Sequence, residues 1–144
     1  MKKRNFILRI VVVSPKEKDV KRLEKLLKKA YCCKIITFND PHKAYEYIQY
    51  NPIEALYTEI AMNGFLGTTL LEKTMEIQPL TRVIFLADSN DFLSEVFEYH
   101  AWYFLVSPFS FKEVCKSLDE TVHYKNRKYT LKEKLIKLLK RTKA

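Results

Sequence analysis

One carboxylate at the end of an apolar run is the first candidate for chemistry in this chain. Glu59 closes a run that begins at Ile53, and Gly64 and Gly67, the only glycines of the 144 residues, follow it. Glycine allows positive φ and close approach of another backbone, so we expect a tight loop here. A single carboxylate is a poor site for a hard metal ion, which prefers several oxygen ligands. The chemistry of Glu59 therefore depends on the residues that the fold brings next to it.

Other reactive side chains form no recognisable set. The histidines His42, His100 and His123 fall on different predicted elements, which argues against a ligand cluster. The cysteines are odd in number and lack C-x-x-C spacing, which favours reduced thiols of a cytoplasmic protein over a disulfide or zinc framework. No Ser-His-Asp, Cys-His or phosphate-loop pattern is present. We therefore expect no enzyme activity, no metal and no cofactor.

Apolar patterns predict the elements that must position Glu59. Continuous runs rich in β-branched residues predict strands buried on both faces, and amphipathic patterns between them predict helices. An α/β fold follows, in which five parallel strands alternate with five helices that cover both faces of the sheet. Ligands of such sheets bind at the carboxyl ends of the strands, where Glu59 is expected. The predicted strands are residues 6–13, 34–38, 53–58, 82–87 and 102–107.

Local signals predict how the helices begin and which faces they bury. Ser14 is expected to cap the first helix, with Pro15 in its first position and Glu17 completing a capping box. The starts predicted for the second and fifth helices are Asp40-Pro41 and Ser110 with Glu113. The inward faces predicted for the third and fourth helices are Leu70, Leu71, Thr74 and Met75, and Phe92, Val96 and Phe97.

The charge is divided unevenly along the sequence. Residues 1–124 contain 17 Lys and Arg against 16 Asp and Glu, whereas residues 125–144 contain 9 against 1. We therefore predict a near-neutral domain over residues 1–124 and a basic amphipathic helix or linker, the C-terminal segment, over residues 125–144. No apolar run approaches the roughly 20 residues of a membrane-spanning helix, so no membrane span is expected. The apolar stripe of the C-terminal segment consists of Leu131, Leu135, Leu138 and Leu139.

Two stretches of the sequence resemble motifs of the receiver domain of bacterial two-component response regulators. EIAMNGFLG, residues 59–67, is similar to the phosphoacceptor segment D-x-x-M-P-G-x-x-G, and VSPFSFKEV, residues 106–114, is similar to the K-P-F motif. The resemblance covers about residues 6–124. It implies a flavodoxin-like, doubly wound three-layer sandwich with strand order 2-1-3-4-5, here with an extended C-terminal helix. It also implies phosphoryl transfer from a histidine kinase to an aspartate, assisted by Mg²⁺, a hydroxyl and a lysine.

The residues that this chemistry requires are replaced at each matching position. The acidic pair that holds Mg²⁺ aligns with Ser14 and Pro15, and the phosphoacceptor aligns with Glu59. Ala87 stands at the hydroxyl position and Ser107 at the lysine position. A carboxylate can attack an anionic phosphoryl group only where cations offset the repulsion. We therefore predict a degenerate phosphoacceptor pocket that binds no Mg²⁺ and is not phosphorylated.

Glu59 has two interpretations at this stage. It could imitate the phosphorylated state by carrying negative charge towards the position of a phosphoryl group. Alternatively, a local cation holds the carboxylate, and Lys16 is the nearest cation by sequence. The resemblance also places a cis peptide bond at Ser107-Pro108.

The resemblance further implies a dimerisation face on the fourth helix, the fifth strand and the fifth helix. Here that face is aromatic, and aromatic residues are enriched at interface cores, although ordinary partial burial is the alternative. Phe104, which lacks a hydroxyl, stands at the switch aromatic position. The residues predicted for the dimer face are Tyr99, Trp102, Tyr103, Phe111 and Cys115.

Two functions remain open. The first is an atypical receiver domain that acts as a homodimer in signal transduction or transcription regulation through protein contacts. The C-terminal segment resembles the linker before a LytTR-type DNA-binding domain, which implies a DNA-binding effector domain outside this chain. The alternative is a nucleic-acid-binding protein that uses Lys125–Lys143, with the receiver fold as a scaffold.

Overall fold

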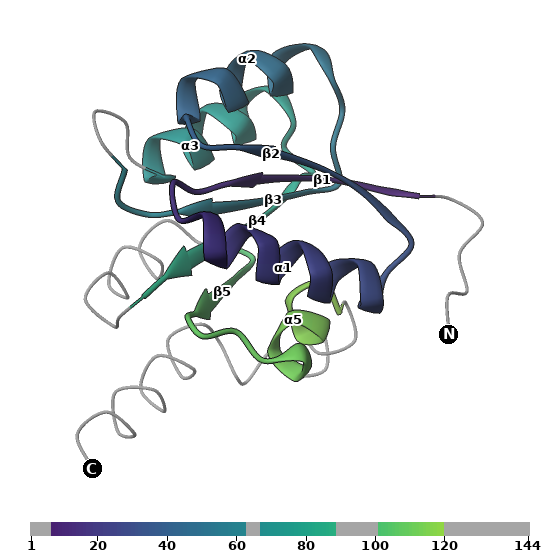
Figure 1. The fold of residues 1–144 in the computed structure, drawn as a ribbon. Helices are drawn as coiled ribbons and strands as arrows, with labels where there is room; N and C mark the ends of the chain where they lie inside the picture. The colour runs from purple at the N-terminus through teal and green to yellow at the C-terminus, as the bar shows by residue number, and fades with distance from the viewer. Residues whose placement is uncertain (1–6, 63–66, 89–100, 120–144) are drawn as a thin grey trace, which may run out of the picture.

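Five parallel strands form a single sheet at the centre of the molecule (Figure 1). The computed structural model describes residues 7–62, 67–88 and 101–119. The strands are β1 (Leu8–Val13), β2 (Cys33–Phe38), β3 (Ala55–Glu59), β4 (Arg82–Ala87) and β5 (Tyr103–Val106). Their order is β2-β1-β3-β4-β5, and every neighbouring pair is parallel. The predicted flavodoxin-like sheet is therefore confirmed.

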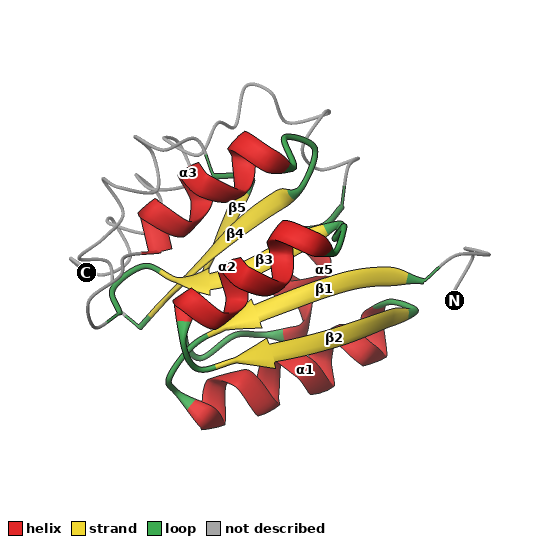
Figure 2. Ribbon diagram, turned by 90° about the horizontal axis from the view of Figure 1, so that it is seen from above, coloured by secondary structure: helices red, strands yellow, loops and turns green. Residues whose placement is uncertain are grey.

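Helices cover both faces of this sheet (Figure 2). Those of the described residues are α1 (Glu17–Ala30), α2 (Pro41–Tyr50), α3 (Gly67–Ile77) and α5 (Phe111–Ser117). α1 and α5 lie on one face, and α2 and α3 lie on the other. None of these helices is long and apolar enough to cross a membrane. The predicted fourth helix with Phe92, Val96 and Phe97 and the predicted C-terminal helix lie outside the described residues.

The alternation of side chains along the strands builds a core layer on each face. In β1, Val11 and Val13 point into the layer under α2 and α3, whereas Ile10 and Val12 point into the layer under α1 and α5. Successive residues of a strand face opposite sides of a sheet, so an uninterrupted apolar run fills both layers. This alternation explains why the sequence predicted strands buried on both faces.

Two of the three predicted helix caps are confirmed. The carboxylate of Asp40 accepts a hydrogen bond from the backbone N–H of His42 at 2.9 Å, with Pro41 at the start of α2. The hydroxyl of Ser110 accepts one from the backbone N–H of Glu113 at 3.1 Å. Each side chain satisfies an N–H group that has no partner inside its helix.

The cap predicted for α1 is wrong. The hydroxyl of Ser14 accepts a hydrogen bond from the backbone N–H of Lys16 at 3.0 Å, so it closes a short turn before the helix. α1 begins at Glu17, and its capping residue is Lys16, which makes no side-chain cap. Pro15 lies in the bend between the strand and the helix rather than in the first helical turn. This bend leaves the side chain of Lys16 at the carboxyl edge of the sheet.

The face predicted for α3 needs one correction. Leu70, Leu71 and Thr74 are buried as predicted, but Met75 is exposed. One residue further along a helix is a rotation of about 100°, so the residue after Thr74 has already left the inward arc.

Candidate functional site

The carboxyl edge of the sheet brings the predicted pocket residues together. Parallel strands end at the same edge, and their arrowheads point to the left in Figure 1. Glu59 is the last residue of β3, Ala87 is the last residue of β4, and Ser107 follows β5. Ser14 follows β1, and its neighbour Val13 is in register with the residue before Glu59. The sequence therefore placed these residues at the correct edge.

Glu59 is held by a cation from the loop between β1 and α1. Its side chain is buried, with only 4% of the residue exposed. The carboxylate oxygen Oε1 lies 3.2 Å from the Nζ atom of Lys16. The other oxygen, Oε2, is buried and has no hydrogen-bond partner in the part of the chain that the structure describes. The predicted pairing of Glu59 with Lys16 is confirmed.

Lys16 makes a second and shorter contact that the sequence did not reveal. Its Nζ atom donates a hydrogen bond to the Oδ2 atom of Asp88 at 2.6 Å. Asp88 directly follows β4 and is largely exposed. The one available signal was its position at the carboxyl end of a predicted strand.

A second link joins α1 to the end of β5. The hydroxyl of Ser107 donates a hydrogen bond to the Oδ1 atom of Asp19 at 3.2 Å. The Ser107-Pro108 peptide bond is cis, as the resemblance predicted. Asp19 lies in the first turn of α1, and its position in the sequence gave no indication of a contact with Ser107. The serine at the lysine position is thus bonded to a carboxylate of the same chain.

Burial and neighbouring charges shift the pKa of three of the four ionisable groups around Glu59. Burial raises the pKa of the Glu59 carboxyl; Lys16 opposes this change, and the charges of Asp19 and Asp88 add to it. Burial lowers the pKa of Lys16, but the contacts with Asp88 and Glu59 outweigh it, so the net shift is upward. The hydrogen bond from Lys16 lowers the pKa of Asp88. Lys16 is therefore held in its charged form, and Glu59 carries the least favoured negative charge.

Gly67 allows the chain after Glu59 to fold back on itself. A Cβ atom at Gly67 would lie 2.0 Å from the backbone carbonyl oxygen of Glu59 and 2.9 Å from the Cα atom of Ile60. The backbone N–H of Gly67 donates to the carbonyl of Ile60 at 2.6 Å. The predicted close approach is confirmed at Gly67, whereas Gly64 lies outside the described residues.

Among the described residues, three carboxylates and one ammonium group gather around Glu59. Asp19, Glu59 and Asp88 contribute carboxylates, and Lys16 contributes the positive charge. Ala87 contributes only a methyl group at this edge. No group of three His, Cys, Asp or Glu side chains among residues 7–62, 67–88 and 101–119 is arranged to hold a metal ion. Chemically, this arrangement neutralises part of the carboxylate charge with an internal cation.

The residues predicted for the dimer face are only partly exposed. Trp102 and Tyr103 pack against the core layer under α1 and α5, and the guanidinium of Arg82 lies 4.9 Å from the centre of the Trp102 ring. Phe111 is 37% exposed, and the Nζ atom of Lys29 lies 4.8 Å from its ring centre. The remaining predicted residues differ in exposure: Cys115 is half-buried, Phe104 at the switch position is buried, and Tyr99 lies outside the described residues.

Comparison with known proteins agrees with this fold. The response regulatory domain of protein mrkE from Klebsiella pneumoniae aligns with a TM-score of 0.71 and 16% identity, over 83% of this chain and 100% of that chain. The response regulator DrrB of Thermotoga maritima, an OmpR/PhoB homolog, aligns with a TM-score of 0.70 and 16% identity, over 83% of this chain and 54% of that chain. The signal receiver domain of an HD domain-containing protein from Pseudomonas fluorescens Pf-5 aligns with a TM-score of 0.72 and 18% identity, over 88% and 96%.

Sequence identities this low show a shared fold and no more. No curated protein matches the sequence. The family model of the response regulator receiver domain, however, matches residues 10–119, which is well over half of the chain. The chain therefore belongs to the response regulator receiver domain family, whose members take part in two-component signal transduction.

Proposed function

We propose that this receiver domain is atypical and signals through protein contacts, without phosphorylation at Glu59 and without catalysis. The observation that carries the proposal is the position of Lys16, whose Nζ atom lies 3.2 Å from Glu59 and 2.6 Å from Asp88. A tethered ammonium group between two carboxylates supplies a positive charge that a phosphorylatable receiver obtains from a bound metal ion. The charge of Glu59 is then balanced by the chain itself.

The charge around Glu59 also disfavours phosphoryl transfer. A carboxylate attacks a phosphoryl group only where cations offset the charge of its oxygens. The groups near Glu59 include the carboxylates of Asp19 and Asp88, which raise its pKa rather than lower it. At the lysine position, Ser107 provides a hydroxyl that donates to Asp19. An incoming phosphoryl group would therefore meet more negative than positive charge.

The same contacts favour one interpretation of Glu59 over the other. An imitation of the phosphorylated state needs a charge that other elements can recognise. The carboxylate of Glu59 is buried, and its partner is Lys16, from the loop before α1. We therefore propose that Glu59 is a structural carboxylate held by a local cation.

The output of the domain is proposed to pass through protein partners. We propose that it forms a homodimer through β5, α5 and the segment between β4 and β5, with an effector partner that regulates transcription. Phe111 on α5 offers an exposed aromatic ring, and Trp102 and Tyr103 at the start of β5 are half-buried. Large aromatic rings of this kind contribute to interface cores.

The test is exposure of the full chain to beryllofluoride or acetyl phosphate with Mg²⁺. We expect an unchanged intact mass after acetyl phosphate and an unchanged fluorescence of Trp102, the only tryptophan. A receiver domain with a complete set of acidic residues and lysine serves as the positive control for the reagents. The matched variant combines Pro15→Asp, Glu59→Asp and Ser107→Lys and is expected to regain Mg²⁺ binding. An adduct at Glu59, or a dimer induced by either reagent, would overturn the proposal.

A second candidate function comes from the charge of the C-terminal segment. Its 9 basic residues against 1 acidic residue favour binding of nucleic acid or another polyanion. In this alternative the receiver fold is a scaffold, and binding is lost when residues 125–144 are removed.

A further inference from the structure

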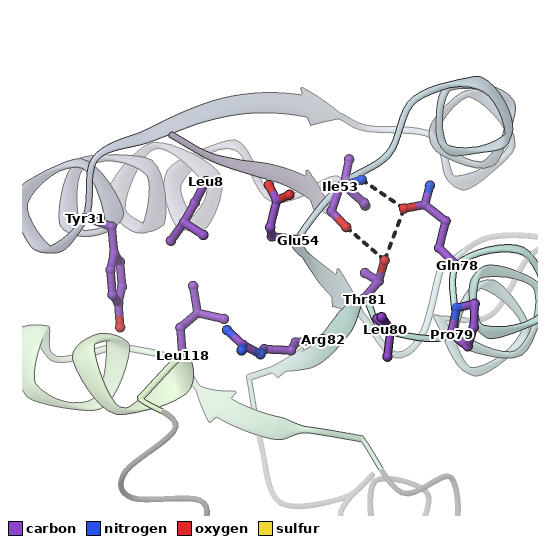
Figure 3. A pocket seen from close by; sticks show the side chains of 10 residues that line it. All are labelled: Leu8, Tyr31, Ile53, Glu54, Gln78, Pro79, Leu80, Thr81, Arg82 and Leu118. Carbon is purple, nitrogen blue, oxygen red and sulfur yellow. Dashed lines mark hydrogen bonds between the residues drawn. The ribbon is translucent and has the colours of Figure 1, made fainter. Parts of the chain in front are cut away.

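A pocket lies at the edge of the sheet opposite Glu59. It has a volume of about 440 Å³ and is open to solvent. Figure 3 shows its walls, which come from the residues after α1, before β3, between α3 and β4 and after α5, and from the starts of β1 and β4. We call it the amino-edge pocket. The lining residues that matter below are Leu8, Tyr31, Ile53, Leu80, Thr81 and Leu118.

The walls of the amino-edge pocket continue the core of the domain. Leu8 and Leu118 belong to the core layer under α1 and α5, and Ile53 belongs to the layer under α2 and α3. Leu80 at the pocket is 93% exposed. Both core layers therefore reach the surface at one place. An apolar side chain inserted here would extend the core and cover Leu80.

The polar groups of the wall are bonded within the domain. The hydroxyl of Thr81 donates to the carbonyl of Ile53 at 2.9 Å, and the side-chain oxygen of Gln78 accepts from the N–H of Ile53 at 2.9 Å (Figure 3). Glu54 accepts hydrogen bonds from the side chain of Arg9. Because these groups already have partners, the pocket favours an apolar occupant over a polar one.

The described chain ends beside this pocket, and the C-terminal segment that follows contains apolar residues that could occupy it. The described chain ends at Asp119, one residue after the wall residue Leu118. Leu131, the first residue of the apolar stripe, follows Asp119 by 12 residues, which span up to about 40 Å when extended. An isolated amphipathic helix of this length is marginal in water and gains stability by packing its apolar face. A tethered segment also has a high effective concentration, on the order of millimolar.

We propose that the apolar stripe of the C-terminal segment, Leu131, Leu135, Leu138 and Leu139, docks in the amino-edge pocket of its own chain. Docking buries Leu80 and holds the basic face of the segment beside the domain. Release makes the basic residues available to an acidic partner. Docking of the C-terminal segment is independent of the chemistry at Glu59, because the two sites lie at opposite edges of the sheet.

The test is amide hydrogen exchange of the full chain, measured by mass spectrometry. Replacing Leu135 and Leu138 by serine (L135S/L138S) is expected to accelerate exchange at residues 78–82 by about fivefold or more. The reciprocal variant Leu80→Ser is expected to accelerate exchange at residues 131–139 by a similar factor. Exchange in β3 should stay unchanged in both variants, which would show that the domain remains folded.

Matched controls separate docking from general effects of substitution. Lys134→Ser with Lys137→Ser alters the same segment but keeps the apolar stripe, so exchange at residues 78–82 should not change. Tyr50→Ser removes another exposed large side chain, one that does not line the pocket, so exchange at residues 131–139 should not change. The proposal is overturned if L135S/L138S leaves the exchange rate of residues 78–82 unchanged. It is also overturned if the control variants accelerate exchange as much as the test variants do. Protection that rises with protein concentration would assign the docked segment to a second copy and also overturn it.

Discussion

At the scale of single residues, the pocket at the carboxyl edge depends on one lysine. Lys16 contacts the buried carboxylate of Glu59 and the exposed carboxylate of Asp88. Removing one partner of a buried ion pair leaves an uncompensated charge and usually costs more than replacing the pair by neutral groups. The two carboxylates differ, since burial raises the pKa of Glu59 and hydrogen bonding lowers the pKa of Asp88. The energetic weight of the site therefore lies in the pair of Lys16 and Glu59.

Substitution of Lys16 tests this pair. Lys16→Met keeps the length of the side chain but leaves Glu59 buried without its cation, so we expect the free energy of unfolding at neutral pH to fall by about 1–2 kcal/mol. Adding Glu59→Gln should recover most of this loss. Denaturant unfolding of the two single variants and the double variant measures the coupling. Lys21→Met, which breaks an exposed pair with Glu17, is the matched control and should change stability by less than about 0.5 kcal/mol. Equal losses in both lysine variants would contradict the assignment.

The pH dependence of stability follows from the shifted pKa of Glu59. Its folded pKa lies above its unfolded value, so its stabilising contribution is fully present below the unfolded pKa. That contribution is lost as the pH rises through the folded pKa. Glu59→Gln removes this loss, and we expect the variant to equal or exceed the natural chain in stability at neutral pH, by about 1 kcal/mol at most. The difference should vanish as the pH falls below the range of carboxyl groups. Thermal unfolding of both proteins across this pH range measures the difference. A Glu59→Gln variant that is less stable than the natural chain at neutral pH would contradict the expected sign.

At the scale of elements, a pair of hydroxyl groups fixes α5 against the sheet. The hydroxyl of Ser117 donates to the carbonyl of Val114 at 2.6 Å, so Tyr57 on β3 donates its own proton to Ser117, also at 2.6 Å. Both side chains are buried, and burial raises the pKa of Tyr57. Removing one partner of a buried hydrogen bond leaves the other unsatisfied, and this lowers stability more than removing both partners does.

This asymmetry predicts unequal effects of two small substitutions. Tyr57→Phe removes the hydroxyl that donates to Ser117 and should lower the free energy of unfolding by about 1 kcal/mol. Ser117→Ala leaves the tyrosine hydroxyl buried without its acceptor and should cost about 1–3 kcal/mol. The double variant should cost less than the sum of the two. Tyr50→Phe removes an exposed hydroxyl and serves as the control in the same denaturant measurement. Additive losses would show that the two hydroxyl groups act independently.

Elements were the most predictable level of this structure. The strands were found because β-branched runs that fill both core layers are visible in the sequence, and the caps at Asp40 and Ser110 are local signals. The cap at Ser14 failed because the bend at Pro15 delays the start of α1 to Glu17, so the hydroxyl of Ser14 accepts from the N–H of Lys16 before the helix begins. The contact between Lys16 and Asp88 joins residues 72 positions apart. Such a contact depends on the order of the strands, in which β3 lies between β1 and β4, and residue spacing does not encode that order.

At the scale of the whole molecule, charge separates the domain from the C-terminal segment. If the alternative function holds, DNA affinity resides in the 9 basic residues of the segment and falls steeply with salt. We expect instead that the full chain binds duplex DNA only weakly at physiological salt, with a Kd of about 10⁻⁴ to 10⁻⁶ M and no sequence preference. Fluorescence anisotropy at several salt concentrations measures this, and a chain without residues 125–144 is the control. Tight, sequence-selective binding that disappears in this control would favour the alternative.

Dimer formation through the face of β5 and α5 is the other prediction at this scale. Phe111 is exposed and contacts Lys29 within the chain, so Phe111→Glu should leave the fold intact while placing a charge in the proposed interface. A charge buried without a partner at an interface core typically weakens binding by 2 kcal/mol or more, which is a change of about 30-fold in the dimer dissociation constant. Sedimentation equilibrium measures this constant. Leu80→Glu places the same charge on a more exposed apolar residue at the opposite edge and should leave dimerisation unchanged. If Leu80→Glu weakens the dimer and Phe111→Glu does not, the interface lies at the amino edge, and the aromatic rings of β5 and α5 serve only to pack the domain.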